Sequence, residues 1–197
     1  TLTEYVPLTV ANGEIGLTPS PYGLTTGSVI LNGIYDTYGP DGVPRILPGI
    51  RIVDLDIQFG EASTIQDMDV TDWHQQFNMR TACLTTIFTL DHRLRVEHQI
   101  VALRHLPNVA LATLRITAVE QTTITLRHTI SVPEDLKPSA QHYREYDEVP
   151  ESPVLSCEAA SPSGRHRLGA AATYVFDREG EAPEWVQEPA SEQEQTI

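Results

Sequence analysis

The chain has 197 residues, of which 40% are hydrophobic, and it carries a formal net charge of −14. This length suits one domain, which can bury about 70% of the surface that its unfolded chain exposes. The negative charge argues against nucleic-acid partners, whose phosphates require a basic face, and against anionic membrane surfaces. We therefore expect a soluble protein, and the composition does not separate a cytoplasmic from a periplasmic or secreted location.

The N-terminal third predicts short strands and turns, followed by a loop. Four glycines are too widely spaced for a phosphate-binding loop, so we expect them in tight turns between strands. Residues 39–49 contain three prolines and three glycines, a composition typical of an exposed loop. The four glycines are Gly13, Gly16, Gly23 and Gly27.

The central part of the chain predicts antiparallel β-structure. Apolar and polar residues alternate in four stretches, as expected for strands with one buried face. Turn-like breaks at residues 91–93 and 106–108 precede the second and third stretches. Strands joined by short turns predict an all-β fold, a large antiparallel β-sandwich. The residues expected to face the core are Val53, Leu55, Ile57 and Phe59; Leu94, Val96, His98 and Ile100; Ala110, Ala112, Leu114, Ile116 and Ala118; and Ile124, Leu126, His128, Ile130 and Val132.

The C-terminal part predicts one further strand between acidic segments. Residues 133–153 contain prolines and acids, which favours a long excursion, and residues 168–176 read as a strand. Residues 179–195 contain six glutamates and no basic residue. We therefore expect a β-sandwich domain at 1–178 and, at 179–197, an acidic tail or mobile loop leading to a missing remainder.

Acidic residues are the first candidates for general acid–base chemistry, which uses positioned carboxyl groups. Asp54 and Asp56 share one face of an expected strand, and Glu97 lies on another. Each is explained most simply as part of a solvated outer face. We assign no catalytic residue to this chain.

The seven histidines show no spacing typical of metal ligands, so we expect no metal and no cofactor. His98 and His128 lie on the inward phase of their strands, which favours buried histidines over a site. Cys83 and Cys157 lie far apart in the sequence and form no CxxC pair. Two free thiols and one disulfide both remain compatible with that spacing.

Five aromatic residues lie in or beside the expected loops. A flat ring can cover the apolar C–H face of a pyranose, but loop aromatics also plug sandwich ends and domain contacts. The candidate substrate-binding residues are Tyr35 and Tyr38, because the adjacent Gly/Pro-rich loop could project them. The five aromatics are Tyr22, Tyr35, Tyr38, Trp73 and Trp185.

An ordered series of short motifs in residues 10–119 resembles the N-terminal β-sandwich domain of glycoside hydrolase family 65, the family of maltose, kojibiose and trehalose phosphorylases and some disaccharide hydrolases. The series is Asn12-Gly13-Glu14-Ile15-Gly16, then Gly33-Ile34-Tyr35, the proline-containing stretch 44–56, and Phe77-Asn78-Met79-Arg80 followed by residues 84–88. The chain departs from the family at Leu17-Thr18-Pro19, where Arg-Gly is frequent, and at Ala82-Cys83, where a glycine is common. These departures indicate a divergent branch.

The resemblance implies a supersandwich like that of galactose mutarotases, packed against an (α/α)6 barrel that holds the catalytic glutamate. No catalytic residue of the family maps onto this chain. The implied partners are that barrel, a second copy in a homodimer, and an oligosaccharide. Because the family domain continues further, we expect a sandwich that is incomplete at its C-terminus, within an enzyme that cleaves α-linked disaccharides by hydrolysis or phosphorolysis.

Two other functions fit the residues. A free-standing carbohydrate-binding sandwich would use Tyr35 and Tyr38. A mutarotase-like enzyme that exchanges sugar anomers would use His98 or His128 with a carboxylate on the sandwich face.

Overall fold

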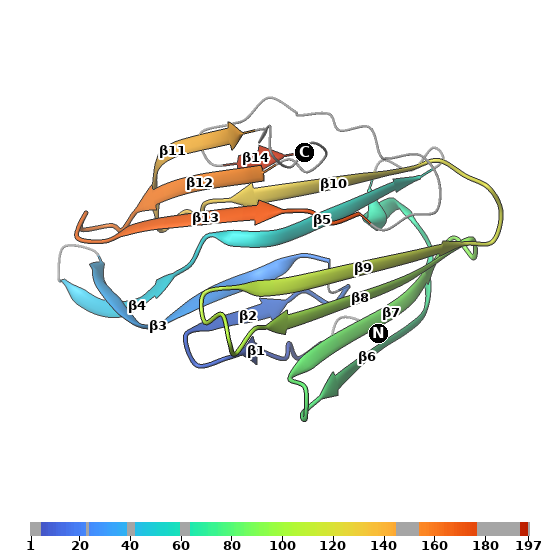
Figure 1. Cartoon of the computed structure of the whole chain (residues 1–197), viewed down its shortest axis with the longest axis horizontal. Helices are drawn as coiled ribbons and strands as arrows, with labels where there is room; N and C mark the ends of the chain where they lie inside the picture. The colour runs from blue at the N-terminus through green and yellow to red at the C-terminus, as the bar shows by residue number, and fades with distance from the viewer. Residues whose placement is uncertain are drawn as a thin grey trace. The chain divides into compact units, whose positions relative to one another are not determined.

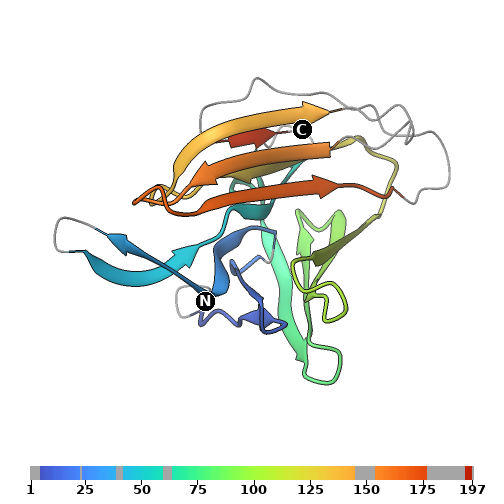
Figure 2. The same ribbon diagram turned by 60° about the vertical axis from the view of Figure 1, so that its left-hand side comes forward.

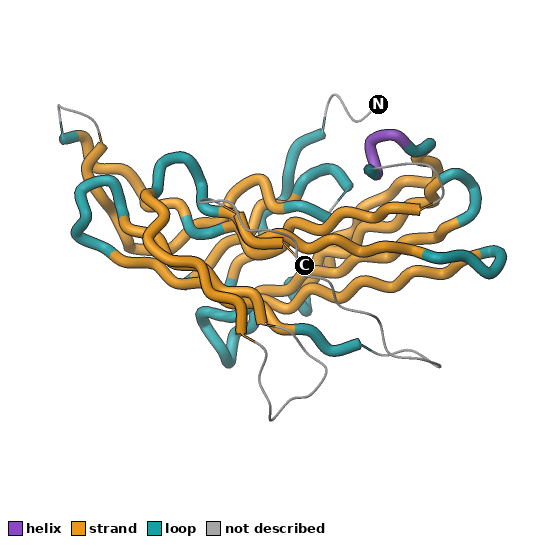
Figure 3. The backbone as a smooth tube through the Cα atoms, turned by 90° about the horizontal axis from the view of Figure 1, so that it is seen from above, coloured by secondary structure: helices purple, strands orange, loops and turns teal. Residues whose placement is uncertain are grey.

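The computed structural model describes residues 5–22, 24–38, 42–59, 64–144, 154–176 and 194–196, without the side chains of 140–144 and 194–196. All its regular elements are strands, apart from a single helical turn, η2 (Ile65–Asp67) (Figure 3). The strands are β1 (Val10–Ala11), β2 (Ile15–Pro19), β3 (Thr26–Tyr38), β4 (Val43–Pro48), β5 (Arg51–Phe59), β6 (Val70–Asn78), β7 (Cys83–Leu90), β8 (Leu94–Ala102), β9 (Ala110–Ala118), β10 (Ile124–Ser131), β11 (Lys137–Arg144), β12 (Val154–Ala160), β13 (Arg167–Thr173) and β14 (Glu194–Thr196).

The strands form four sheets, ordered β1-β2-β3-β4, β14-β10-β5, β11-β12-β13 and β6-β7-β8-β9. Every strand pairing with a described register is antiparallel. The predicted fold class, an all-β antiparallel sandwich, is confirmed. The chain divides into two compact units, of which the first comprises Thr1–Gly33 and Leu55–Arg127 and the second Ile34–Asp54 and His128–Ile197.

The first unit contains the β6–β9 sheet, seen in Figure 1 as four neighbouring strands. Its main core cluster includes four fully buried residues, Phe88, Leu90, Leu94 and Val96. Along β8 alternate residues are buried, from Leu94 to Ala102, as the sequence pattern predicts. The predicted turn at residues 91–93 joins β7 to β8.

The second unit contains the β11–β12–β13 sheet and the hairpin formed by the end of β3 and β4 (Figure 2). Its core includes Leu47 from the hairpin, Ile130 from β10 and Leu155 from β12, all fully buried. Ile52 of β5 packs against the same cluster. The long sequence separations show that this core forms only when distant segments meet.

Two segments predicted as irregular contain strands. The loop prediction for residues 39–49 is wrong over β4, and the excursion prediction for 133–153 is wrong over β11. Both strands lie at the end of a sheet, where proline is tolerated because alternate residues direct their N–H groups away from the neighbouring strand. Pro138 of β11 also sits at a register shift, which absorbs its missing N–H.

Two of the predicted turn glycines lie inside strands. Gly13 does occupy a turn, with φ of +103°, but Gly16 belongs to β2 and Gly27 to β3. A Cβ at Gly16 would lie 3.4 Å from the Cγ2 atom of Thr9, which is an ordinary van der Waals contact. Gly23 lies outside the described residues.

The inward pattern predicted for β9 and β10 holds only in part. Leu114 and Ile116 are half-buried against the core, while Ala112 and Ala118 are exposed. Leu126 of β10 is also exposed. The apolar–polar alternation from Ala110 to Ala118 therefore overstates burial on β9. This strand is at the end of its sheet and has a neighbour on one side only among the described residues.

The predicted acidic tail at 179–197 lies mostly outside the described residues. Within it, Glu194–Thr196 are extended and pair with Thr129–Ser131 of β10.

Candidate functional site

The candidate residues Tyr35 and Tyr38 lie near the end of β3, in the hairpin with β4. They are three positions apart on a strand, so their side chains leave from opposite faces. Tyr35 is 57% exposed, whereas Tyr38 is half-buried and packs against the core of the second unit. One flat platform made of both rings is therefore not formed, and Tyr35 alone is available to a ligand.

The Tyr38 side chain is held by its own hairpin. The Arg45 guanidinium lies over its ring, 5.7 Å from the centroid, an arrangement typical of cation–π contacts. The Tyr38 hydroxyl is buried and has no hydrogen-bond partner among the described residues. Burial, with smaller contributions from the charges of Asp135 and Asp36, raises the pKa of Tyr38 and keeps the phenol neutral.

Between the two tyrosines, Asp36 is buried and anchors the hairpin to the β12–β13 loop. Its carboxylate accepts hydrogen bonds from the Ser163 hydroxyl and backbone N–H, from the Ser161 hydroxyl and from the Thr37 N–H. These bonds, the serine hydroxyls first, hold the pKa of Asp36 far below its usual range. The His166 ring bonds the Tyr35 carbonyl oxygen at 3.1 Å, so it is engaged with the backbone and not with a serine hydroxyl.

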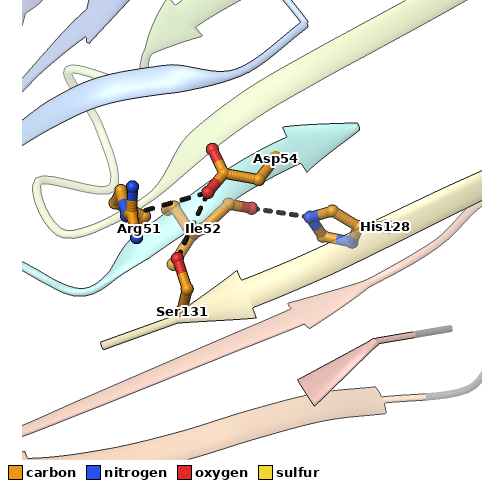
Figure 4. Close-up of polar contacts among 5 residues, drawn as sticks. All are labelled: Arg51, Ile52, Asp54, His128 and Ser131. Carbon is orange, nitrogen blue, oxygen red and sulfur yellow. Dashed lines mark hydrogen bonds and ion pairs between the residues drawn. The ribbon is translucent and has the colours of Figure 1, made fainter. Parts of the chain in front are cut away.

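His128 lies in a second polar cluster, where β5 meets β10 (Figure 4). Its Nε2 atom is 2.9 Å from the Ile52 carbonyl oxygen and must donate to it, so its Nδ1 accepts from the Tyr174 hydroxyl. The two rings meet edge to face, with centroids 5.4 Å apart. Burial lowers the pKa of His128, against smaller opposing effects of the Ile52 carbonyl and the Asp54 charge. This neutral histidine has no free nitrogen for a sugar.

The carboxylates singled out in the sequence are held in local contacts. Asp54 accepts from the Ser131 hydroxyl at 3.2 Å and lies 3.8 Å from the Arg51 Nε atom, as Figure 4 shows. Asp56 accepts from the Ile65 N–H at 3.2 Å. Both aspartates are half-buried, so the outer face expected for them is only partly solvated. These contacts orient the carboxylates within the fold.

The other titratable groups of the described residues are not grouped for chemistry. His98 is buried, as predicted, and lies between Thr86 and Leu114 in the strand register. Cys83 and Cys157 are both free, and burial raises the pKa of the Cys157 thiol to about 12. In the described part of the chain, no three His, Cys, Asp or Glu residues are grouped for a metal ion, and no helix is long and apolar enough to cross a membrane.

The motifs that carry the family resemblance have structural roles. The Asn12 Oδ1 atom accepts from the N–H groups of Glu14 and Ile15, and its Nδ2 donates to the carbonyls of Leu103 and Pro107, each of these bonds being 2.8–3.0 Å long. One asparagine thus closes its own turn and joins the β8–β9 connection. Among the described residues this motif serves folding.

The second landmark forms the β6–β7 hairpin. The Asn78 Oδ1 atom accepts from the N–H groups of Arg80 and Thr81 at 3.0 and 3.3 Å, and Met79 is 86% exposed at the tip. Ala82 has φ of +53°. This left-handed conformation favours glycine, so a glycine would fit the backbone at this position.

The strands and their polar clusters define an antiparallel β-sandwich without an assembled catalytic group among its described residues. The chain is 28% identical over 175 residues to a kojibiose hydrolase from Flavobacterium johnsoniae and 28% identical over 179 residues to one from Mucilaginibacter mallensis. Each match covers 88% of this chain, which spans about a quarter (26%) of either relative. These matches confirm the resemblance to glycoside hydrolase family 65.

The fold is also found in a solved structure from the human microbiome that is assigned as a kojibiose phosphorylase. The TM-score is 0.70 at 10% identity, over 96% of this chain and 27% of the other. This likeness shows a shared fold. No family model matches the chain.

Sequence reasoning missed the Asp36 anchor. Its partners Ser161 and Ser163 lie in a Ser-Pro-Ser-Gly turn that carries no signal of a distant partner. The one available signal was Asp36 itself, a lone acid between two tyrosines on an otherwise uncharged strand. An acid in such a place needs hydrogen-bond donors if it becomes buried.

Proposed function

We propose that this chain is the non-catalytic sandwich domain of an enzyme that cleaves an α-linked disaccharide by hydrolysis or phosphorolysis. The observation that carries the proposal is the asymmetry of the matches, which cover 88% of this chain but 26% of each kojibiose hydrolase. The enzyme's remaining part supplies the catalytic (α/α)6 barrel, and this domain supports it.

The contacts of the titratable groups in this chain support a structural and not a catalytic role for the domain. An acid–base reaction on a sugar needs a titratable group that can reach the substrate. His128 is buried with both ring nitrogens bonded, and Asp36 is buried and held by serine donors. Groups engaged in this way stabilise a fold and leave the chemistry to another domain.

In the proposed enzyme, a glutamate of the barrel protonates the leaving oxygen while water or phosphate attacks from the opposite face. Hydrolysis requires a second carboxylate as base, whereas phosphate is already nucleophilic. The choice between the two reactions therefore depends on residues of the barrel. Kojibiose is the first substrate to test, because both curated relatives are kojibiose hydrolases.

The test compares the polypeptide made by the source cell with this chain alone. We expect an intact mass several times the 21.8 kDa of this chain and turnover of kojibiose by the intact polypeptide. The isolated chain should give no glucose, and no sugar phosphate when phosphate is added. A cellular polypeptide of 21.8 kDa, or turnover by the isolated chain, would overturn the proposal.

A second candidate function is carbohydrate binding by the chain itself. The observation in its favour is the 57% exposure of the Tyr35 ring on the outer face of the β3–β4 hairpin. One exposed ring can stack on a pyranose face without any catalytic group.

A further inference from the structure

Two of the asparagines in this chain, Asn12 and Asn32, are followed by a glycine. In such a pair the backbone nitrogen of the glycine can attack the side-chain carbonyl carbon of the asparagine, since glycine has no Cβ to hinder the approach. The backbone nitrogen gives up its proton, and the side-chain nitrogen leaves as ammonia. Water then opens the resulting five-membered succinimide to aspartate or isoaspartate. The contacts of each asparagine decide whether this reaction takes place in the folded chain.

The Asn12 amide is held by four hydrogen bonds. Its Oδ1 atom accepts from the N–H groups of Glu14 and Ile15, both at 3.0 Å. Its Nδ2 atom donates to the carbonyls of Leu103 and Pro107, both at 2.8 Å. These bonds must break before the amide carbon can turn toward the following backbone nitrogen, and the side chain is half-buried. The fold therefore protects Asn12.

The Asn32 side chain has far fewer contacts. It is exposed, and among the described residues it makes one hydrogen bond, in which its Nδ2 atom donates to the Gly13 carbonyl at 2.7 Å. The following Gly33 is exposed and has φ of +73°, and a Cβ built there would meet no atom within 4 Å. The space beside the reacting atoms is thus open, and the amide can turn after a single bond is broken.

The backbone at Asn32 also lies where regular pairing ends. The described β2–β3 register ends at Ile15↔Leu31, and one position further the Asn32 N–H donates to the Glu14 carbonyl at 2.8 Å. The chain passes from the first compact unit to the second directly after Gly33. Local opening costs least free energy at the ends of paired and packed segments, so this backbone can reach the geometry that ring closure needs.

The other two asparagines are followed by larger residues. Asn78 and Asn108 are exposed, but Met79 and Val109 come next in the chain. A side chain on the following residue hinders ring closure, and the β-branched Val109 does so most. The Asn78 side chain is also engaged in the β6–β7 turn. Only Asn32 combines an exposed side chain, a following glycine and a single side-chain hydrogen bond among the described residues.

We propose that Asn32 is a site of spontaneous deamidation, at which water converts the side-chain amide to aspartate and isoaspartate while the chain is folded. Both products lose the donor to the Gly13 carbonyl, and aspartate sets a carboxylate against that oxygen. Isoaspartate also lengthens the main chain by a methylene group just before residues 34–38, where Asp36 is bonded to Ser163. Both products therefore weaken the structure around Asn32.

Peptide mapping of the aged chain tests the proposal. The chain is kept in mildly alkaline buffer, either folded or in urea, and is then cleaved after glutamate, which places Asn12 and Asn32 in different peptides. In urea both sites should convert at similar rates. In the folded chain Asn32 should convert roughly tenfold faster than Asn12 or more, since one hydrogen bond of the amide must break instead of four.

Two results of the mapping would overturn the proposal. One is conversion of Asn12 as fast as that of Asn32 in the folded chain. The other is an Asn32 amide that persists in the folded chain while urea converts both sites. The polypeptide made by the source cell, aged in the same way, should show the same order of rates, and an Asn32 amide that persists there would refute the proposal for the cellular protein.

Two variants separate deamidation from other effects of ageing. Asn32→Gln keeps an amide donor, but its longer side chain must close a six-membered ring, which forms far more slowly. The thermal midpoint of the wild type should fall on ageing by about 2–4 °C, as expected for the loss of about one hydrogen bond in a chain of this length. Asn32→Gln should keep its midpoint, and Asn32→Asp should begin at the lower value. An equal fall on ageing in the wild type and Asn32→Gln would overturn the role assigned to Asn32.

Discussion

The carboxylate of Asp36 on β3 accepts hydrogen bonds from the hydroxyl and the backbone N–H of Ser163, a residue 127 positions later in the chain. This contact holds the β3–β4 hairpin to the β12–β13 loop within the second unit. Because Asp36 is buried, its charge is stable only while these donors remain in place.

Replacing Asp36 should therefore weaken the second unit. Asp36→Asn keeps the shape but loses the charge-assisted hydrogen bonds, so the urea midpoint at pH 7 should fall. The exposed Glu158→Gln on β12 is the matched control and should leave the midpoint unchanged. Equal midpoints for Asp36→Asn and the wild type would contradict the anchoring role.

The same aspartate predicts a loss of stability in acid. Its pKa is lowered in the folded state, so its contribution is present above the unfolded value of about 3.9 and is lost as pH falls toward the folded value. The wild type should lose stability below about pH 4 more steeply than Asp36→Asn. Urea titrations at pH 5, 4 and 3 measure this difference, and parallel curves would exclude the effect.

His128 predicts a second pH dependence, at higher pH. Burial lowers its folded pKa, so the unfolded chain binds the proton first and stability falls as pH drops below about 6.5. The thermal midpoint of the His128→Gln variant should therefore change less between pH 7 and pH 5 than that of the wild type. The variant His105→Gln, at an exposed position, should keep the pH dependence of the wild type. His128→Leu should also cost about 1–3 kcal/mol at pH 7, since the Ile52 carbonyl loses its donor.

The sequence predicts strands well where one face is buried and poorly where the sheet ends. Along β8 the alternation from Leu94 to Ala102 matches burial at each position, because strands on both sides complete the core. On β9 the same alternation overstates burial at Ala112. The alternation of polar and apolar residues along a strand indicates which face is buried. It does not indicate whether a neighbouring strand is present.

The exposure of the two candidate tyrosines was predicted only in part, for a similar reason. Tyr35 is exposed as expected, but Tyr38 packs inward, because residues an odd number of positions apart on a strand face opposite sides. Because a loop was expected beside these residues, their side chains were not assigned to alternating faces of a strand. The proline-rich composition of residues 39–49 favours a loop, but Pro44 lies on the edge strand β4, where proline is tolerated.

Ala82 offers a test of backbone strain at the β6–β7 hairpin. A non-glycine residue at φ of +53° is strained, so Ala82→Gly should stabilise the chain by about 0.5–1 kcal/mol. Ala171→Gly, at an exposed position of β13, should have the opposite sign and cost about 0.5–1 kcal/mol. Urea unfolding of both variants decides the matter, and a loss of stability in Ala82→Gly would exclude strain at this turn.

The loss of unfolding free energy caused by truncating a core side chain should increase with the burial of that side chain. Ile100 is almost fully buried, so Ile100→Ala should cost about 2–5 kcal/mol. Ile116 is half-buried on β9, so Ile116→Ala should cost less, about 1–2 kcal/mol in the isolated chain. Equal losses in the two variants, measured by urea unfolding, would contradict this ranking by burial.

Of the two candidate tyrosines, Tyr35 is the one that we propose as a contact for a sugar, because its side chain is exposed. If the exposed ring stacks on a pyranose face, Tyr35→Ala should weaken kojibiose binding by about 0.5–1.5 kcal/mol, or roughly twofold to tenfold in Kd. Tyr35→Phe keeps the ring and should bind as the wild type does. Calorimetric titration of the isolated chain measures all three proteins. An affinity unchanged in Tyr35→Ala, or no binding heat in the wild type, would remove the carbohydrate-binding function and leave the outer face of the hairpin without a ligand.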